Sequence, residues 1–291
     1  MPVNMILGTV QFGLPYGVNN EAGKPSQEQV EEILAEAYRS GIRTLDTSNV
    51  YGDAENVIGN FHKKNNFCFQ VNTKFVYQAG ITIKDKLTGT LKKVGVAKIK
   101  TYFFHLFTDY VSHPELIEEL KDLRKENYIH QIGISVYTNH EFETAINDPA
   151  IDVIQIPFNM LDNRYQRGAL LRKAKLKHKI IQVRSVFLQG LFFKPFSSLP
   201  HYLQPLKPYL QSLHTIAQKN GLTMEDLCLQ YAAAQTEIDE IIIGVDNKEQ
   251  LIRNVNCLHK PVEKNILEAI SAIQVKETTL LYPFNWKQAG V

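Results

Sequence analysis

Four titratable side chains are spaced along the first part of the chain in a way that suits proton donation. They are Asp46, Tyr51, Lys74 and His105, and the first two lie in the segment TLDTSNVYG (44–52). A free phenol has a pKa of about 10 and is a slow acid near neutrality, but a neighbouring ammonium favours the phenolate and lowers that pKa. We therefore expect Asp46 to pair with Lys74 and to keep it charged beside Tyr51. His105 would then orient a substrate carbonyl.

Each of these side chains also has a purely structural interpretation. An aspartate and a lysine often form a structural ion pair, and His105 is flanked by Phe103, Phe104 and Phe107, where a hydrogen-bonded core histidine is common. Perturbed ionisable groups mark functional sites only as a tendency. The catalytic interpretation therefore depends on whether the fold brings all four side chains to one place.

Short apolar segments alternate with longer amphipathic ones from end to end. The predicted strands are residues 5–10, 43–48, 67–75, 99–105, 129–135, 153–158, 180–186 and 240–245. The predicted helices are residues 25–41, 53–61, 82–95, 112–127, 139–146, 163–178, 202–221, 223–235 and a last helix over 261–276. This alternation implies parallel strands joined by right-handed crossovers.

Eight such strands are the number that closes a barrel. The main rival is a doubly wound open sheet, but no G-x-G-x-x-G turn follows the first strand, and GTVQFG lacks the spacing. We find no internal repeat and no Pro/Ser-rich linker. The sequence therefore predicts an α/β protein with a (β/α)8 TIM barrel as a single domain over 1–291, with a short C-terminal tail after about 277.

In an α/β barrel the carboxyl ends of the strands face the active site, so polar residues there indicate chemistry. The second strand ends at Asp46, and Tyr51 lies in the loop that follows it. The third strand ends at Lys74 and the fourth at His105. Later strands add Ser135, Gln155, Asn159, Arg184, Ser185 and Gly244 at the same face.

The order of several motifs gives a family resemblance. The D-T-x-x-x-Y-G element that contains Asp46 and Tyr51 is preceded by LGTVQFG and followed by NTKF, FFHLF, QIGIS, QIPFN, RSVFLQGLF and IIIGVDNKEQLIRNV, over roughly residues 5 to 258. In this arrangement the chain resembles the aldo/keto reductase family. The resemblance implies a (β/α)8 barrel that binds a nicotinamide dinucleotide without a Rossmann domain, with Tyr51 as the general acid, Lys74 and Asp46 tuning it and His105 orienting the carbonyl.

The resemblance also implies a set of cofactor-binding residues. Ser135 and Gln155 would hold the carboxamide, Arg184 would stack on the nicotinamide ring, and the remaining residues would contact the rest of the dinucleotide. They are Gly8 and Thr9 at the first strand, Ser185, Phe187, Gln189 and Gly190 in the pyrophosphate loop, and Gly244, Asn247, Gln250 and Asn254 around the adenosine half.

The chain departs from the family pattern at three places. Val136 follows Ser135 where an asparagine is frequent, and Val186 stands where proline is frequent. Asp246 stands where an arginine or lysine often binds the 2′-phosphate, and a carboxylate there repels a phosphate and accepts from a ribose hydroxyl. Lys248 and Arg253 lie close enough in sequence to compensate, and the family preference for NADP(H) over NAD(H) is retained as the expectation.

The bulk properties exclude several classes of function. The formal net charge is +2 and no Lys/Arg run is dense enough for nucleic acid, and no apolar run approaches the roughly 20 residues that span a bilayer. The three cysteines have no paired spacing, which argues against a zinc knuckle, a metal site and a disulfide framework. We therefore expect a cytoplasmic protein, a monomer or simple homo-oligomer, that acts on a small molecule.

The predicted activity is NAD(P)H-dependent reduction of an aldehyde or ketone to the alcohol, with sugars among the candidate substrates. An apolar pocket is expected from the aromatic residues in the loops: Phe12, Tyr16, Phe75, Phe107, Phe158, Phe187 and Trp286. One alternative is a non-catalytic redox sensor that binds the dinucleotide. Another is a Schiff-base lyase that uses Lys74, although Asp46 would keep that lysine protonated.

Overall fold

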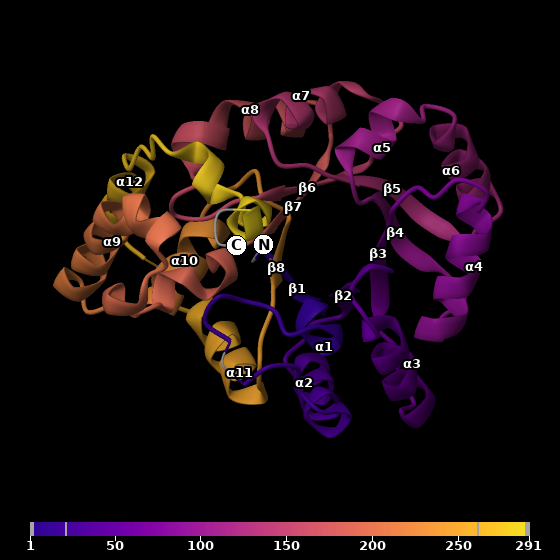
Figure 1. Cartoon of the computed structure of the whole chain (residues 1–291), viewed down its shortest axis with the longest axis horizontal. Helices are drawn as coiled ribbons and strands as arrows, with labels where there is room; N and C mark the ends of the chain where they lie inside the picture. Colours follow the sequence, from indigo (N-terminus) through magenta and orange to yellow (C-terminus); the bar gives the residue numbers. More distant parts are fainter. Residues whose placement is uncertain (1–2, 21, 261, 289–291) are drawn as a thin grey trace.

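The computed structural model describes residues 3–20, 22–260 and 262–288, and its strands close into one parallel barrel (Figure 1). Each strand pairs with the next along the chain, and the last pairs with the first. The strands are β1 (Asn4–Gly8), β2 (Thr44–Asp46), β3 (Gln70–Phe75), β4 (Ile99–Phe104), β5 (Ile129–Ser135), β6 (Val153–Pro157), β7 (Ile180–Arg184) and β8 (Glu240–Ile243). The (β/α)8 barrel expected from the sequence is confirmed, with every predicted strand present.

Helices surround the barrel on all sides in Figure 1. The longer ones are α2 (Gln27–Arg39), α3 (Ala54–Lys64), α4 (Ile83–Val94), α6 (Leu116–Lys125), α7 (Asn139–Asn147), α8 (Arg164–Leu176), α9 (Lys207–Lys219), α10 (Met224–Ala233), α11 (Lys248–Cys257) and α12 (Lys264–Ser271). The short ones are α1 (Val10–Gly13), α5 (Phe107–Ser112) and the 3₁₀ turns η1 (Leu188–Phe193), η2 (Phe196–Ser198), η3 (His201–Leu206), η4 (Thr278–Leu281) and η5 (Pro283–Gln288).

Some helix boundaries differ from those predicted. The predicted helix over 202–221 is divided into η3 and α9, because Pro205 and Pro208 each lack the N–H that a continuous helix needs. The last helix, α12, is shorter than the predicted 261–276, and residue 261 lies outside the described residues. Helix α11 was not predicted as a helix. Other local signals hold, such as the capping box at Ser26 that starts α2.

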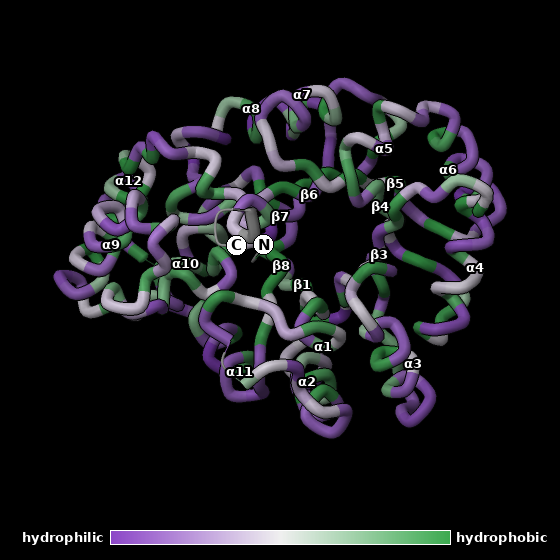
Figure 2. Tube along the Cα trace, viewed as in Figure 1, coloured by the Kyte–Doolittle hydropathy of each residue, from purple (hydrophilic) through white to green (hydrophobic). Residues whose placement is uncertain are grey.

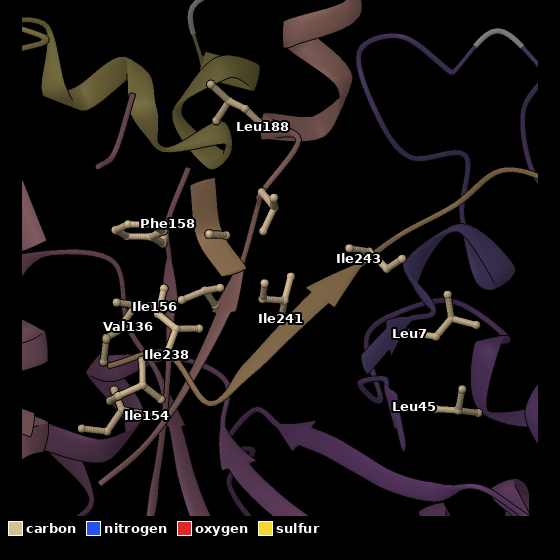
Figure 3. Packing of buried hydrophobic residues seen from close by; sticks show 14 of the residues in the cluster. Leu7, Leu45, Val136, Ile154, Ile156, Phe158, Leu188, Ile238, Ile241 and Ile243 are labelled. Atoms are coloured by element: carbon tan, nitrogen blue, oxygen red, sulfur yellow. The ribbon is translucent and has the colours of Figure 1, made fainter. Parts of the chain in front are cut away.

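The strands alternate between two environments, as a period of two requires. One set of side chains packs against the helices in the hydrophobic core, and Figure 3 shows several of its members on β1, β2, β6 and β8. They include Leu7, Leu45, Ile154, Ile156, Ile241 and Ile243. The intervening positions include Asp46, Gln155 and Glu240, which point into the barrel. Polar side chains that point into the barrel therefore stand between buried apolar neighbours.

Hydropathy follows the same division (Figure 2). Hydrophilic residues lie along the outer turns of helices such as α3, α4 and α6, and hydrophobic residues lie along the strands and the inner helix faces. In α2 the inner face is built from Val30, Ile33, Leu34 and Ala37, all fully buried. The result is a rigid barrel whose strand ends present the loops that carry the site.

Candidate active site

A cavity of about 390 Å³ opens at the carboxyl ends of the strands. Of the residues predicted at the site, Asn159 and Asn247 do not line this cavity, and the following do: Gly8, Thr9, Asp46, Tyr51, Lys74, His105, Ser135, Gln155, Arg184, Ser185, Phe187, Gln189, Gly190, Gly244, Gln250 and Asn254. Asn247 is exposed and lies at the start of α11, where its side chain accepts from the Gln250 N–H at 2.9 Å and caps the helix. The barrel thus gathers residues that are up to about 250 positions apart in the sequence into one site.

Lys74 and Asp46 form a buried ion pair on the neighbouring strands β3 and β2. The Lys74 side chain is 1% exposed and donates to Oδ1 of Asp46 and, at 3.2 Å, to the carbonyl oxygen of Thr47. Oδ2 of Asp46 accepts from Nε2 of Gln155 at 2.9 Å. Burial lowers the pKa of Lys74, and the attraction of Asp46 opposes that shift. The pairing predicted from the sequence is present.

Tyr51 lies beside this ion pair, with Nζ of Lys74 5.2 Å from the centre of its ring. Burial, followed by the charge of Asp46, raises the pKa of the Tyr51 phenol, so the lowering that we expected from Lys74 does not dominate. The reason is that burial disfavours the phenolate and the charge of Asp46 repels it, while the positive charge of Arg184 opposes the rise. The phenol is therefore protonated at neutral pH, which is the form that a general acid needs.

His105 lies beside Tyr51 in the cavity lining, with the two rings edge to face at a centroid distance of 5.9 Å. Its Nδ1 lies 3.0 Å from the hydroxyl oxygen of Ser48, which holds the ring in place. Burial, together with the positive charges of Lys74 and Arg184, lowers the pKa of His105 to about 3. The imidazole is neutral across the physiological range, and its single N–H is free for a ligand in the tautomer in which Nδ1 accepts from the Ser48 hydroxyl.

Gln155 continues the polar contacts into the interior of the barrel. Its Nε2 also donates to Oε1 of Gln182 at 3.2 Å, and Nε2 of Gln182 donates to Glu240 at 2.6 Å. Glu240 in turn pairs with Lys100 at 2.7 Å. Two ion pairs are thereby joined through two glutamines. The arrangement leaves Oε1 of Gln155, a residue of the cavity lining, buried and without a hydrogen-bond partner among the described residues.

The loop after β7 has a constrained backbone. Ser185, Leu188 and Gln189 have φ values of 60°, 46° and 55°, a conformation that non-glycine residues adopt only when the surroundings hold it. Gln189 accepts from the N–H of Val18 at 3.0 Å and donates from its side chain to the Tyr16 hydroxyl at 2.8 Å. The loop between β1 and α2 is therefore fastened to the β7 loop at one side of the cavity.

Gln11 and Tyr137 are among the cavity-lining residues that were not predicted from the sequence. Oε1 of Gln11 is buried and has no partner among the described residues, and Gly244 makes room for it, since a Cβ there would lie 2.5 Å from Nε2 of Gln11. The ring of Tyr137 stacks under the Arg184 guanidinium. Gln11 lies two positions after Thr9 and Tyr137 two positions after Ser135, so spacing from a strand end is the signal that could have found them.

The expected apolar lining is only partly present. Of the seven predicted aromatic residues, only Tyr16 and Phe187 line the cavity. Two aromatic residues that were not predicted, Tyr137 and Phe193, line it as well. The others do not line it: Phe12, Phe75, Phe107, Phe158 and Trp286. Except for the half-buried Phe107, these are buried in the core. The cavity wall is therefore more polar than the sequence suggested.

The part of the cavity lining at and just before α11, here called the α11 side, includes the charged residues Asp246 and Arg253. Asp246 is half-buried, and its backbone N–H and Oδ2 both bond the side chain of Gln250, at 2.8 and 3.3 Å. Its Oδ1 is buried without a partner among the described residues, and burial raises the pKa of the carboxyl. Glu225 also lines the cavity, whereas Lys248 does not.

The sequence that forms this barrel and cavity matches a known protein family. The model of the Aldo/keto reductase family matches residues 4–275. The chain belongs to the aldo/keto reductase family. Membership supports an oxidoreductase that acts on carbonyl compounds.

Relatives and solved structures agree with this aldo/keto reductase assignment. YqkF, an uncharacterized oxidoreductase of Bacillus subtilis (strain 168), is 24% identical over 268 residues, or 83% of this chain and 85% of YqkF. Aldo-keto reductase AKR11C1 from Bacillus halodurans, in its holo form, matches with a TM-score of 0.75 at 19% identity over 95% of each chain. Glycerol dehydrogenase AKR11B4 from Gluconobacter oxydans matches with a TM-score of 0.72 at 18% identity, over 93% of this chain and 91% of the other. These structural matches show the shared fold.

Aldo/keto reductases use nicotinamide cofactors, and the cavity fits such a group. The unpartnered Oε1 atoms of Gln155 and Gln11 are acceptors that suit an amide or a hydroxyl of the cofactor.

Within residues 3–20, 22–260 and 262–288, no group of three or more His, Cys, Asp and Glu side chains is arranged to hold a metal ion. No helix in the same part of the chain is long and apolar enough to cross a membrane.

Proposed function

We propose that this aldo/keto reductase uses a nicotinamide dinucleotide to reduce an aldehyde or ketone to the alcohol, with Tyr51 as the general acid. The observation that supports this most strongly is that a protonated phenol, a neutral imidazole and a buried ion pair share one cavity wall. Each has the protonation state that its role needs at neutral pH. Small carbonyl compounds, including sugars, are the proposed substrate class.

The bound dinucleotide supplies the hydride. Tyr51 donates its proton to the carbonyl oxygen as negative charge develops there, and the adjacent Lys74 ammonium stabilises the phenolate that remains. Asp46 keeps the ammonium oriented through its Oδ1. His105 donates from its free ring N–H to the same carbonyl oxygen and fixes its position, while the Ser48 hydroxyl holds the other ring nitrogen.

The proposed cofactor contacts follow from the lining residues. Ser135 and Gln155 would hold the carboxamide, and Arg184 would lie beside the nicotinamide ring. The β7-loop residues Ser185, Phe187, Gln189 and Gly190 would contact the pyrophosphate, and Gly8, Thr9, Gly244, Gln250 and Asn254 would contact the remaining parts. NADP(H) is the proposed form of the cofactor, with Arg253 as the cation available to a 2′-phosphate and Asp246 opposing it.

The Schiff-base alternative is disfavoured by the position of Lys74. Its ammonium is buried, paired with Asp46 and bonded to the carbonyl oxygen of Thr47, so it offers no free amine to a substrate. Borohydride treatment with an aldehyde is expected to leave Lys74 unmodified.

The proposed location of the protein is the cytoplasm. It is proposed to act as a monomer or simple homo-oligomer that binds neither nucleic acid nor membrane.

The Tyr51→Phe variant tests the proposal. We expect kcat to fall by about 10²- to 10⁴-fold on a panel of aldehydes, because the proton donor is lost. The dissociation constant of the dinucleotide, measured by fluorescence, should change little. Tyr165→Phe is the matched control, since the Tyr165 side chain is exposed on α8. Undiminished turnover by Tyr51→Phe would remove Tyr51 from its role, and cofactor binding without turnover by the unaltered protein would favour the redox sensor.

A further inference from the structure

Arg184 carries a positive charge that no acidic side chain in the described part of the chain neutralises. We call the part of the cavity that it shares with Tyr51, Lys74 and His105 the catalytic end. Arg184 ends β7 and is half-buried. One of its N–H groups donates to the carbonyl oxygen of Val136 at 3.2 Å. No aspartate or glutamate in the described part of the chain forms an ion pair with it. Its guanidinium is therefore available to bind an anion that a ligand supplies.

The other charges near Arg184 are already balanced. Lys74 and Asp46 neutralise each other, and His105 is neutral because burial and the nearby cations lower its pKa to about 3. Burial is the main cause of the raised pKa of Tyr51, and Arg184 acts on that phenol as a nearby positive charge. The catalytic end of the cavity therefore has a net charge of one positive unit, located on the guanidinium beside the reacting groups.

The guanidinium is held in a fixed orientation. Its Cζ lies 4.1 Å from the centre of the Tyr137 ring, which in turn contacts Phe284 edge to face at 4.7 Å and Tyr282 at 5.9 Å. The aromatic cluster fixes one face of the guanidinium, and the bond to Val136 uses one donor. The remaining N–H groups keep the fork geometry that binds a carboxylate or phosphate in a bidentate manner.

We infer that Arg184 binds an anionic group of the substrate, so that the preferred substrates are carbonyl compounds that also carry a carboxylate or phosphate. This inference rests on the proposed function and narrows its substrate class. A cofactor phosphate is the other source of an anion in this cavity. The residues proposed to lie near a cofactor phosphate, Asp246 and Arg253, also line the cavity. Substituting them therefore measures the effect of the cofactor phosphate separately from that of Arg184.

The test compares two substrates of nearly equal shape and different charge. They are 4-carboxybenzaldehyde and its neutral methyl ester, methyl 4-formylbenzoate, each measured as kcat/KM with the unaltered protein and with Arg184→Met and Arg184→Lys. We expect the unaltered protein to prefer the carboxylate by at least about 10-fold, since a charge-assisted bidentate contact has that strength. Arg184→Met should abolish the preference and Arg184→Lys should retain part of it. The preference should also weaken as salt is added.

Arg253→Gln is the matched control, because it removes a cation from the other side of the same cavity. It should leave the ratio between carboxylate and ester unchanged. Equal kcat/KM values for the two substrates with the unaltered protein would overturn the inference. So would an Arg184→Met variant that leaves the substrate ratio intact, since Arg184 would then serve only the cofactor.

A binding measurement separates this inference from the proposed reaction. The alcohols 4-(hydroxymethyl)benzoate and methyl 4-(hydroxymethyl)benzoate are titrated into the cofactor-bound protein, with quenching of the nicotinamide fluorescence as the readout. Tighter binding of the carboxylate, lost in Arg184→Met, supports the inference even if neither aldehyde is reduced. In that case only the proposed function fails. Equal affinity for the two alcohols would contradict the inference independently of turnover.

Discussion

Nε2 of Gln155 lies 2.9 Å from Oδ2 of Asp46, across the barrel between β6 and β2. The residue proposed to hold the carboxamide is therefore bonded to the carboxylate that pairs with Lys74. A flipped Gln155 amide would place its oxygen against that carboxylate, so Asp46 fixes which end of the amide faces the cavity. The proposed carboxamide contact and the orientation of the ion pair therefore depend on one hydrogen-bonded unit.

The first prediction concerns this unit. Gln155→Leu removes both the cavity-facing acceptor and the donor to Asp46, so we expect about 10-fold weaker dinucleotide binding and about 10-fold lower kcat. Gln182→Leu removes the second acceptor of the Gln155 amide without touching the cavity lining, and its effects should be in the same direction but smaller. Fluorescence titration and steady-state kinetics give the two quantities separately. An unchanged kcat in Gln155→Leu would show that Asp46 does not depend on Gln155.

The second prediction concerns the form of the cofactor. Asp246→Asn removes a half-buried carboxylate near the proposed 2′-phosphate position and should improve NADPH binding relative to NADH by about 5-fold or more. Arg253→Gln removes an exposed cation and should shift the ratio of the two dissociation constants in the opposite direction, by less. Separate titrations of NADH and NADPH measure the ratio. If neither variant changes it, the α11 side of the cavity does not contact the 2′ position.

The third prediction concerns stability and pH. The native pKa of His105 is about 3 and its value in the unfolded chain is about 6.5, so between these values the unfolded state binds a proton that the native state does not. The contribution of His105 is therefore fully present above pH 6.5 and is lost as the pH falls towards 3. A single proton gives a slope of up to about 1.4 kcal/mol per pH unit in the free energy of unfolding.

Urea denaturation at several pH values checks this slope. His105→Gln should show a shallower loss of stability below pH 6.5 than the unaltered protein. The control is His130→Gln, whose side chain is exposed at the start of β5. Identical slopes for the unaltered protein and His105→Gln would mean that the pKa of His105 is the same in the folded and unfolded states, which would contradict the lowered native pKa.

The barrel and much of the site were predictable because they depend on local pattern and a topological rule. Alternating apolar and amphipathic segments indicated the strand count, and the rule that barrel sites lie at carboxyl strand ends selected Asp46, Lys74 and His105. These three residues follow on consecutive strands, so their proximity needs no knowledge of distant contacts. The ion pair between Asp46 and Lys74 is accordingly found as expected.

The remaining features depend on contacts that no local pattern contains. Gln155 meets Asp46 across the barrel interior, between strands that are not neighbours, and the sequence holds no register for such a contact. The direction of the Tyr51 pKa shift depends on how deeply the phenol is buried, which only the packed structure determines. Asn247 precedes a helix that was not predicted, and its role as a cap was therefore not predicted either.

The last prediction tests the packing that supports the β2–β3 side of the site. Gly59 in α3 faces α4 so closely that a Cβ at this position would overlap the carbonyl oxygen of Lys93. Gly59→Ala must push the two helices apart and should lower the free energy of unfolding by about 1–3 kcal/mol. Gly89 is the matched control in α4, because it is exposed and no atom lies within 4 Å of the position that a Cβ would take. Gly89→Ala should raise stability by about 0.5–1 kcal/mol, because alanine loses less backbone entropy in a helix. Urea midpoints at constant m-value compare the two, and equal effects of both substitutions would contradict the tight α3–α4 contact.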